Sequence, residues 1–192
     1  MPKIIDVQER QVRVSEAAWR VLRRDGIAAL SLRNIASEAG MPPSSLRYTF
    51  PTVESVRIHA ADLVRERVQS RMARFEQKPR DRVWAEETLA ELLPLDEDRR
   101  VEMEVYISLG TASLTEAALR PAYEAIQSSV RTVCAEALAA LGNPDDEHAV
   151  AALHALLDGL AVHLVHQEAR EPTAWARQSL SHFLEILTRS RS

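Results

Sequence analysis

Residues 30–50 constrain the fold more than any other part of this 192-residue chain, because they predict two short helices around a tight turn. Ser31 is a suitable N-cap, since its hydroxyl can accept a hydrogen bond from a free amide of the first turn. Gly40 stands where a left-handed C-cap is favoured, and Pro42 and Pro43 suit the turn and the start of a second helix. Between them, apolar residues recur at spacings of three and four: Leu32, Ile35, Ala36 and Ala39.

The second of these helices has one apolar side and one polar side. Leu46 and Phe50 form the apolar side, which we expect to lie in the core. The polar side consists of Ser44, Ser45, Arg47, Tyr48 and Thr49. Two short helices joined by a glycine-containing turn form a helix-turn-helix, whose second helix enters the major groove of DNA. Because a helix of two turns is unstable alone, neighbouring helices must support it.

Apolar faces on both sides of the motif predict those supporting helices. One helix buries residues from Val14 to Leu22 and ends at Asp25-Gly26, and another begins after Thr52, a suitable N-cap. We therefore predict a helix-turn-helix domain at residues 1–52, with the motif at about 31–50.

The remaining residues, 53–192, predict helices separated by proline and glycine. The expected ranges are about 52–77, 80–93, 97–114 and 121–141, a helix whose first turn contains residues 145–147, and a last helix over 173–188. Five glycines and the absence of alternating β-branched patterns predict an all-α chain.

Composition and charge fit a regulator that binds nucleic acid. Residues 1–57 carry nine Lys and Arg against six Asp and Glu, a net +3, whereas residues 58–192 carry fifteen against twenty-two, a net −7. A basic head on an acidic body is expected when only the head meets phosphate, although +3 can also be ordinary variation. The chain lacks a signal-peptide pattern and an apolar run of membrane-spanning length, and its single cysteine suits a reducing cytoplasm.

Residues from about 10 to 64 resemble the DNA-binding domain of the TetR family of bacterial repressors. The residues that carry the resemblance are Ala17-Ala18, Gly26, residues 30–36, Glu38-Ala39-Gly40 and residues 45–51. The Leu-Arg-aromatic form at residues 46–48 resembles a branch that includes choline-responsive regulators. The family often has tyrosine where Arg47 stands and a basic residue where Val53 stands; arginine can still reach a phosphate, but valine cannot.

The resemblance implies about nine helices: a three-helix helix-turn-helix domain and a C-terminal domain, residues 53–192, for ligand binding and dimerisation. It also implies double-stranded DNA as a partner. We expect the residues nearest the bases to be Pro43, Ser44, Ser45 and Tyr48, and those nearer the backbone to be Ser31, Arg33, Arg47 and Thr49. Ser31 is at least a cap, and Arg33 could be merely solvated.

The last two long helices suggest how two copies could associate. Apolar residues at spacings of three and four form a seam of Val150, Leu153, Leu157, Leu160 and Leu164, and the final helix adds Trp175, Phe183 and Ile186. These faces could build a four-helix bundle with a second copy, as the resemblance implies. Seam spacing alone predicts burial within one chain equally well.

A ligand pocket is expected among the middle helices, for an unidentified small-molecule effector. Candidate lining residues are Phe75, Trp84, Met103, Tyr106, Tyr123, His154 and Asp158, although aromatic and methionine side chains at helical spacing are more often core residues. Asp158 could receive a cationic ligand or pair with an arginine. His154 and Asp158, and His163 and His166, share helix faces, but the sequence has no third ligand nearby, so we expect no metal and no other cofactor.

The resulting expectation is a cytoplasmic, ligand-responsive transcriptional regulator. It is expected to repress by binding a palindromic operator as a homodimer and to be released by an inducer. An enzyme is not expected, because glycine-rich phosphate loops and nucleophile motifs are missing, and acid pairs such as Glu102 and Glu104 have the pattern of a solvated helix surface. The alternative is a helical protein-interaction adaptor without sequence-specific DNA binding.

Overall fold

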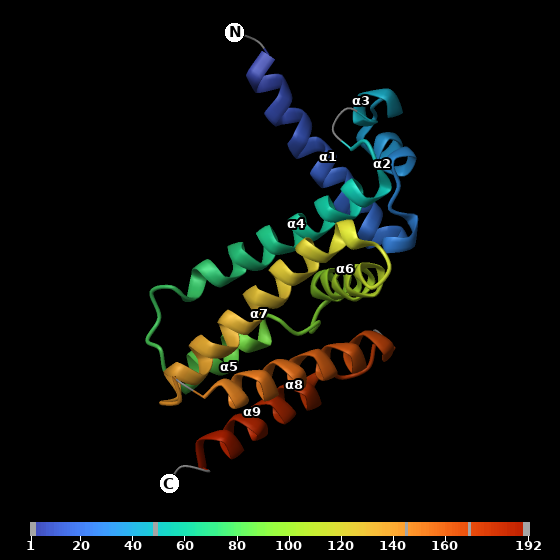
Figure 1. Ribbon diagram of the computed structural model, residues 1–192. Helices are drawn as coiled ribbons and strands as arrows, with labels where there is room; N and C mark the ends of the chain where they lie inside the picture. The colour runs from blue at the N-terminus through green and yellow to red at the C-terminus, as the bar shows by residue number, and fades with distance from the viewer. Residues whose placement is uncertain (1–2, 48–49, 145, 169, 190–192) are drawn as a thin grey trace. The chain divides into compact units, whose positions relative to one another are not determined.

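A computed structural model describes residues 3–47, 50–144, 146–168 and 170–189, and within them residues 3–9, 11, 53 and 189 by their backbone alone. Across these ranges the chain forms α-helices and short 3-10 turns without a strand, which confirms the predicted all-α class. The described residues contain nine α-helices, α1 to α9 (Figure 1). They form two compact units, and α4, α6 and α7 each contribute residues to both.

The first compact unit consists of residues 1–66 and 104–123. Its elements are α1 (Lys3–Asp25), α2 (Leu32–Ala39), α3 (Pro43–Arg47), the first part of α4 (Val53–Met72), the second part of α6 (Glu97–Ser113) and the start of α7 (Arg120–Ala140). The apolar face predicted on α1 is buried from Val14 to Leu22. The helix extends well before that face, to Lys3, because residues 3–13 contain neither glycine nor proline to interrupt it.

The ends of the helices around the motif follow the predicted capping chemistry. The Ser31 hydroxyl accepts a hydrogen bond from the Asn34 amide at 3.2 Å. Gly40 ends α2 in the left-handed conformation, with a φ of 63°, and α3 begins at Pro43. Thr52 caps α4, since its hydroxyl accepts from the Ser55 amide at 3.2 Å. These short-range signals therefore place α2, the turn and the start of α3 correctly.

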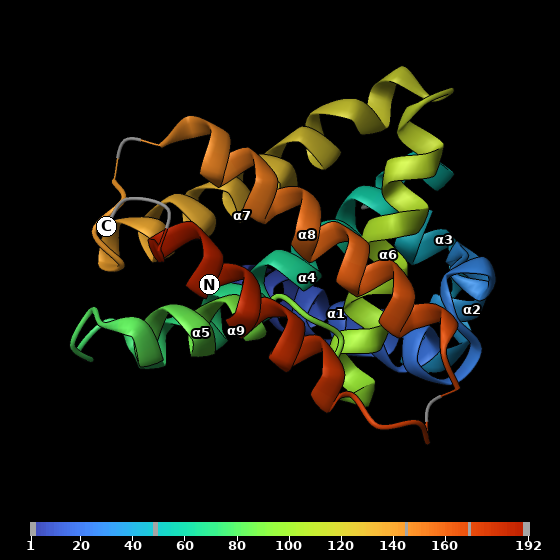
Figure 2. The ribbon, with the colours of Figure 1, turned by 90° about the horizontal axis from the view of Figure 1, so that it is seen from below.

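The second compact unit consists of residues 67–103 and 124–192. It contains α5 (Arg82–Ala90), α8 (Glu147–His166), α9 (Ala174–Arg189) and the remaining parts of α4, α6 and α7. Helices α8 and α9 lie side by side in both ribbon views and are in contact (Figure 2). Their facing leucines join a core with Trp84 and Leu89 of α5 and with Leu138 of α7. Because burying one such side chain is worth roughly 2 kcal/mol, this core holds the unit together.

Helix α8 passes a simple test for a membrane span, contrary to the sequence-based expectation. It has 20 residues, with a mean hydropathy of 1.5 over its most apolar 18-residue window. Seven of its residues, among them Leu153, Leu157 and Leu164, are buried inside the second unit. The core helix of a folded body satisfies the same length and hydropathy criteria, and we assign α8 to that class.

The two compact units do not follow the predicted division at residue 52. The boundary within α4 lies between Glu66 and Arg67, and residues 104–123 return to the first unit. A continuous α4 therefore carries residues of both units, whereas the predicted boundary lies before its first turn. The domain division remains a prediction about function and differs from the division into compact units.

Candidate functional site

The helix-turn-helix presents most of its predicted contact residues to the surface. Arg33 on α2 and Pro43, Ser44 and Arg47 on α3 are exposed, and Ser45 is half-buried. Leu46 is buried, as is Phe50 after α3, and both hold the motif against the unit's core as expected. Predicted contacts at Tyr48 and Thr49 lie outside the described residues.

Ser31 and Asn34 hold the N-terminal end of α2. Besides the Ser31 cap, the Asn34 side-chain amide donates to the carbonyl of Ala29 at 2.7 Å. Ser31 is half-buried, so its side chain caps the helix and is still partly accessible to solvent. Arg33, one residue before Asn34, points to solvent on the described surface.

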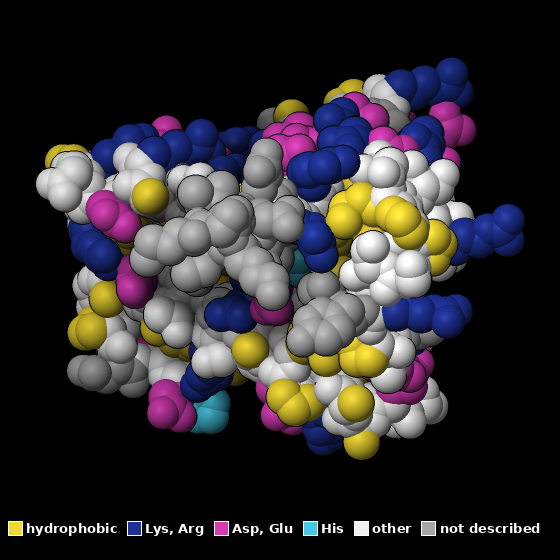
Figure 3. Space-filling model, turned by 90° about the horizontal axis from the view of Figure 1, so that it is seen from above, with side chains coloured by type: hydrophobic (Ala, Val, Ile, Leu, Met, Phe, Trp, Pro, Cys, Tyr) yellow, Lys and Arg dark blue, Asp and Glu magenta, His cyan; other side chains and the backbone are white. Residues whose placement is uncertain are grey.

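The described surface is not uniformly basic. In Figure 3, Lys and Arg side chains (dark blue) are interspersed with Asp and Glu side chains (magenta). Two arginines of α1, Arg20 and Arg24, bind carboxylates instead of standing alone. The net charge of +3 predicted for the head is therefore distributed over paired and exposed groups, and the exposed guanidinium of Arg47 is well suited to meet phosphate.

His59 on α4 lies beneath the motif within the first unit. Its ring contacts Phe50 at a centroid distance of 4.8 Å, and its Nε2 lies 3.2 Å from the Ser15 hydroxyl. Burial lowers the pKa of His59 from its usual value, against the opposing influence of Asp62 and Glu66. The neutral ring thus belongs to the packing that supports α3.

Two of the predicted effector contacts, Phe75 and Trp84, are core residues of the second unit. Phe75 is 5% exposed and Trp84 is 4% exposed. The indole of Trp84 donates to the carbonyl of Phe75 at 3.2 Å, and Met103 packs against the same core. Neither aromatic side chain is accessible to a ligand without rearrangement, so a packing role is favoured for both residues.

His154 and Asp158 face each other on α8, and Asp158 is partly exposed although its sequence neighbours are apolar. The Asp158 side chain is 42% exposed, whereas that of His154 is 13% exposed. His154 Nε2 lies 3.8 Å from Asp158 Oδ2, beyond hydrogen-bonding distance, and has no hydrogen-bond partner. Asp158 is partly exposed because its position is turned by about 100° around the helix from Leu157, away from Leu160, and so leaves the buried face.

Tyr106 and Tyr123 form a stacked pair in the first unit, with ring centroids 5.7 Å apart. The ring of Tyr123 lies directly on Gly110, where a Cβ atom would come within 2.9 Å of its Cε2. Both tyrosines are half-buried. The seven predicted effector contacts are therefore divided between the units, with this pair in the first and five residues in the second.

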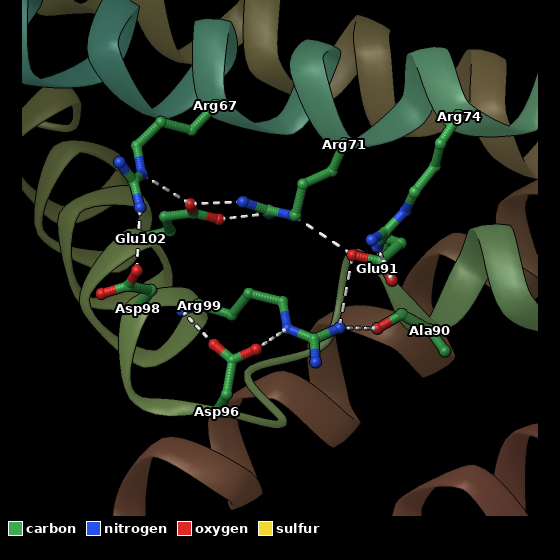
Figure 4. Close-up of polar contacts among 9 residues, drawn as sticks. All are labelled: Arg67, Arg71, Arg74, Ala90, Glu91, Asp96, Asp98, Arg99 and Glu102. Atoms are coloured by element: carbon green, nitrogen blue, oxygen red, sulfur yellow. Dashed lines mark hydrogen bonds and ion pairs between the residues drawn. The ribbon is translucent and has the colours of Figure 1, made fainter.

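A network of charged residues in the second unit was not predicted from the sequence (Figure 4). Glu102 accepts hydrogen bonds from Arg71 Nη1 at 2.6 Å and from Arg67 Nε at 3.3 Å, and Arg67 also bonds Asp98 at 2.9 Å. Glu102 is only 5% exposed, so its assignment to a solvated helix surface was wrong. Although burial opposes the charged form, Glu102 raises the pKa of Arg71 above its usual value.

Glu91, at the end of α5, extends this network. Its Oε1 lies 2.6 Å from Arg74 Nη2, and its Oε2 lies within ion-pair distance of Arg71 Nε (3.2 Å) and Arg99 Nη1 (3.5 Å) without hydrogen-bond alignment. A cavity of about 280 Å³ beside the network is lined by Arg67, Ser70, Arg71, Asp96, Asp98 and Arg99. Five of its six lining residues are charged, and the predicted effector contacts are not among them.

The α8 seam predicted for dimerisation is buried within one chain. Its members are between 0% and 6% exposed: Val150, Leu153, Leu157, Leu160 and Leu164. Since a fully buried side chain cannot contact a second copy, we assign the seam to intrachain packing against α9 and the core. On α9, Trp175 is 36% exposed and Ile186 is 47% exposed, while Phe183 is half-buried.

Comparison with known proteins gives matches over most of the chain. Residues 15–56 match the family model of bacterial regulatory proteins of the tetR family, and residues 79–189 match that of the C-terminal part of BetI-type transcriptional repressors. The chain is 32% identical to the HTH-type transcriptional regulator PksA of Bacillus subtilis (strain 168) over 177 residues, which cover 88% of this chain and 85% of that protein.

Two solved structures share the fold. A putative transcriptional regulator from Saccharomonospora viridis, in complex with choline, has a TM-score of 0.76 at 23% identity, over 93% of this chain and 96% of that chain. The multidrug binding protein EbrR, complexed with ethidium, has a TM-score of 0.67 at 28% identity, over 91% of this chain and 98% of that chain.

Proposed function

Because this chain belongs to the tetR family of bacterial regulatory proteins, whose members are DNA-binding transcriptional regulators and not enzymes, we propose that it represses transcription from a palindromic operator. The observation that carries the proposal is the exposed polar side of α3 at the end of a capped helix-turn-helix. A helical adaptor would have no need of such a surface. We propose that the regulator acts in the cytoplasm, because bacterial DNA lies there.

The DNA contacts proposed from the sequence are kept. Pro43, Ser44 and Ser45 lie at the start of α3, the end that reaches base edges when a recognition helix enters the major groove. Arg47, at the end of α3, suits a backbone phosphate. Tyr48 and Thr49 remain proposed contacts on the sequence pattern.

We infer a homodimer because a single short recognition helix such as α3, described over Pro43–Arg47, offers few contacts. A two-fold dimer presents two copies to successive major grooves, about 34 Å apart, and thereby doubles the surface that meets DNA. The proposed interface comprises the exposed apolar side chains of α8 and α9, namely Val162, Trp175 and Ile186, with Phe183 beside them. This choice replaces the buried α8 seam.

The proposed effector is an apolar organic cation. Ethidium, the ligand in the EbrR structure, is a planar aromatic cation, and residues 58–192 of this chain carry a net charge of −7. Tyrosine faces attract such cations. Two separate sets of candidate contacts are therefore retained, Tyr106 with Tyr123 in the first unit and His154 with Asp158 in the second. Phe75, Trp84 and Met103 are more easily explained as packing.

Selection of genomic fragments by the purified protein tests the proposed function. We expect enrichment of fragments that share one palindrome with half-sites about 10 base pairs apart, or a multiple of that spacing. A variant with Ser44→Ala and Ser45→Ala should lose this enrichment while it retains weak binding to all fragments. Enrichment of no common sequence by the unaltered protein would favour the helical adaptor.

A further inference from the structure

Helix α3 depends on α2 for its orientation. Its described part, Pro43–Arg47, is too short to be stable alone and packs on α2, which in turn packs on α1. Gly40, Met41 and Pro42 separate the two short helices, so a small tilt of the last turn of α2 is passed directly to α3. Whatever holds that last turn therefore sets the angle of the recognition surface.

Two arginines of α1 hold the last turn of α2 through one carboxylate. Arg20 Nε donates to Glu38 Oε1 at 2.8 Å, and Arg24 Nη1 donates to Glu38 Oε2 at 2.8 Å. The arginines are four residues apart and therefore lie on one face of α1. Hydrogen bonds from Arg24 and Arg20 lower the pKa of Glu38, so the carboxylate is charged at neutral pH.

A third arginine of α1 reaches the backbone at the same place. Arg13 Nη2 donates to the carbonyl of Ala39 at 3.0 Å. This carbonyl belongs to the C-terminal turn of α2, whose last carbonyls lack partners within the helix and carry partial negative charge. Glu38 and Ala39 immediately precede Gly40, so all three contacts lie at the entrance to the turn.

We propose that Glu38 is a positioning residue for DNA recognition, which fixes the angle of α3 by binding Arg20 and Arg24 at once. This inference rests on the proposed reading of bases by α3. Glu38 itself touches no base in this account. Its effect is on sequence discrimination, because base contacts require a fixed angle whereas phosphate attraction tolerates a range of angles.

The solvent exposure of Glu38, Arg20 and Arg24 separates a positioning role from a purely structural one. The Glu38 side chain is 20% exposed, and those of Arg20 and Arg24 are 50% and 60% exposed. Ion pairs in such surroundings contribute little to folding stability. Removal of the carboxylate should therefore leave the protein folded and change the orientation of α3.

The test compares Glu38→Gln with Asp62→Asn, which makes the same change of charge on the exposed face of α4. The measured quantity is the affinity for a selected palindrome divided by the affinity for a scrambled fragment of equal length. Partial unfolding or altered charge changes both affinities by similar factors and leaves this ratio intact. We expect the ratio to fall about tenfold in Glu38→Gln, comparable with the effect of one mismatched base pair, and to be unchanged in Asp62→Asn.

Further variants make the result decisive. Glu38→Asp retains the charge and should recover part of the ratio, and Arg24→Gln removes one donor and should lower it even if Glu38→Gln fails to fold. Equal ratios for the unaltered protein, Glu38→Gln and Arg24→Gln would overturn the positioning role. If the unaltered protein itself does not prefer the palindrome, the proposed function fails instead.

Discussion

At the scale of single residues, Arg47 is the clearest candidate for a phosphate contact, because it is exposed at the end of α3. We predict that Arg47→Ala weakens binding to all DNA sequences alike. The slope of log affinity against log salt should become shallower by about one for each phosphate that the variant no longer neutralises. DNA-binding titrations at several salt concentrations measure this slope. The control of equal charge change is Arg170→Ala, because Arg170 is an 86% exposed arginine of the second unit. An unchanged slope would remove Arg47 from the interface.

His59 makes the stability of the first unit depend on pH. Burial lowers the pKa of His59 in the folded state below the usual histidine pKa of 6.5. As the pH falls below 6.5, the unfolded chain therefore binds a proton at His59 more readily than the folded protein does. The stabilising contribution is present above that value and is lost as the pH falls through the lowered pKa. We expect the Tm to fall between about pH 7 and about pH 5, and to fall less in His59→Gln. An exposed-residue control, His182→Gln, should retain the full pH dependence; identical profiles for both variants would contradict the role of His59.

At the scale of helices, the network around Glu102 links the second part of α4 to α6. Removing the charge of Glu102 leaves Arg67 and Arg71 without their shared carboxylate in a site where Glu102 is 5% exposed. Leaving a buried charge without any partner costs about 3–5 kcal/mol. We expect a smaller loss of about 1–3 kcal/mol for Glu102→Gln, because Arg67 keeps Asp98 and Arg71 keeps Glu91. Denaturant unfolding measures the decrease in the free energy of unfolding.

Glu87→Gln is the matched control, since Glu87 pairs with Lys78 and both side chains are nearly half exposed. An exposed pair is worth at most about 1 kcal/mol, so this variant should unfold almost like the original protein. Equal decreases for Glu87→Gln and Glu102→Gln would show that burial of Glu102 has no energetic consequence.

Predictability from sequence differed between helix ends and helix faces. The cap at Ser31, the left-handed Gly40 and the cap at Thr52 were correct because each depends on residues within one turn. The burial of Glu102 was missed because its partners lie 31 and 35 residues away on α4. Periodicity identified the α8 seam as buried, but it could not distinguish α9 of the same chain from a second copy.

At the scale of the whole molecule, the helix that follows the helix-turn-helix continues from the first compact unit into the second. Helix α4 contributes to both compact units, and its change of unit falls between Glu66 and Arg67, where the charged network begins. The matched family models cover residues 15–56 and 79–189, so most of α4 lies between them. A helix shared by two units can couple effector binding to DNA binding. Such coupling is reciprocal, because the effector changes the affinity for DNA by the same factor by which DNA changes the affinity for the effector.

The most direct measurement compares the affinity of the unaltered protein for its selected palindrome with that for the same fragment carrying one scrambled half-site. Two linked recognition helices bind far more tightly than one, so we predict that the affinity falls by at least about 100-fold when one half is scrambled. Scrambling a flanking segment of equal length should change little. Equal affinity for the intact and the half-scrambled fragment would contradict recognition of a palindromic operator by a homodimer.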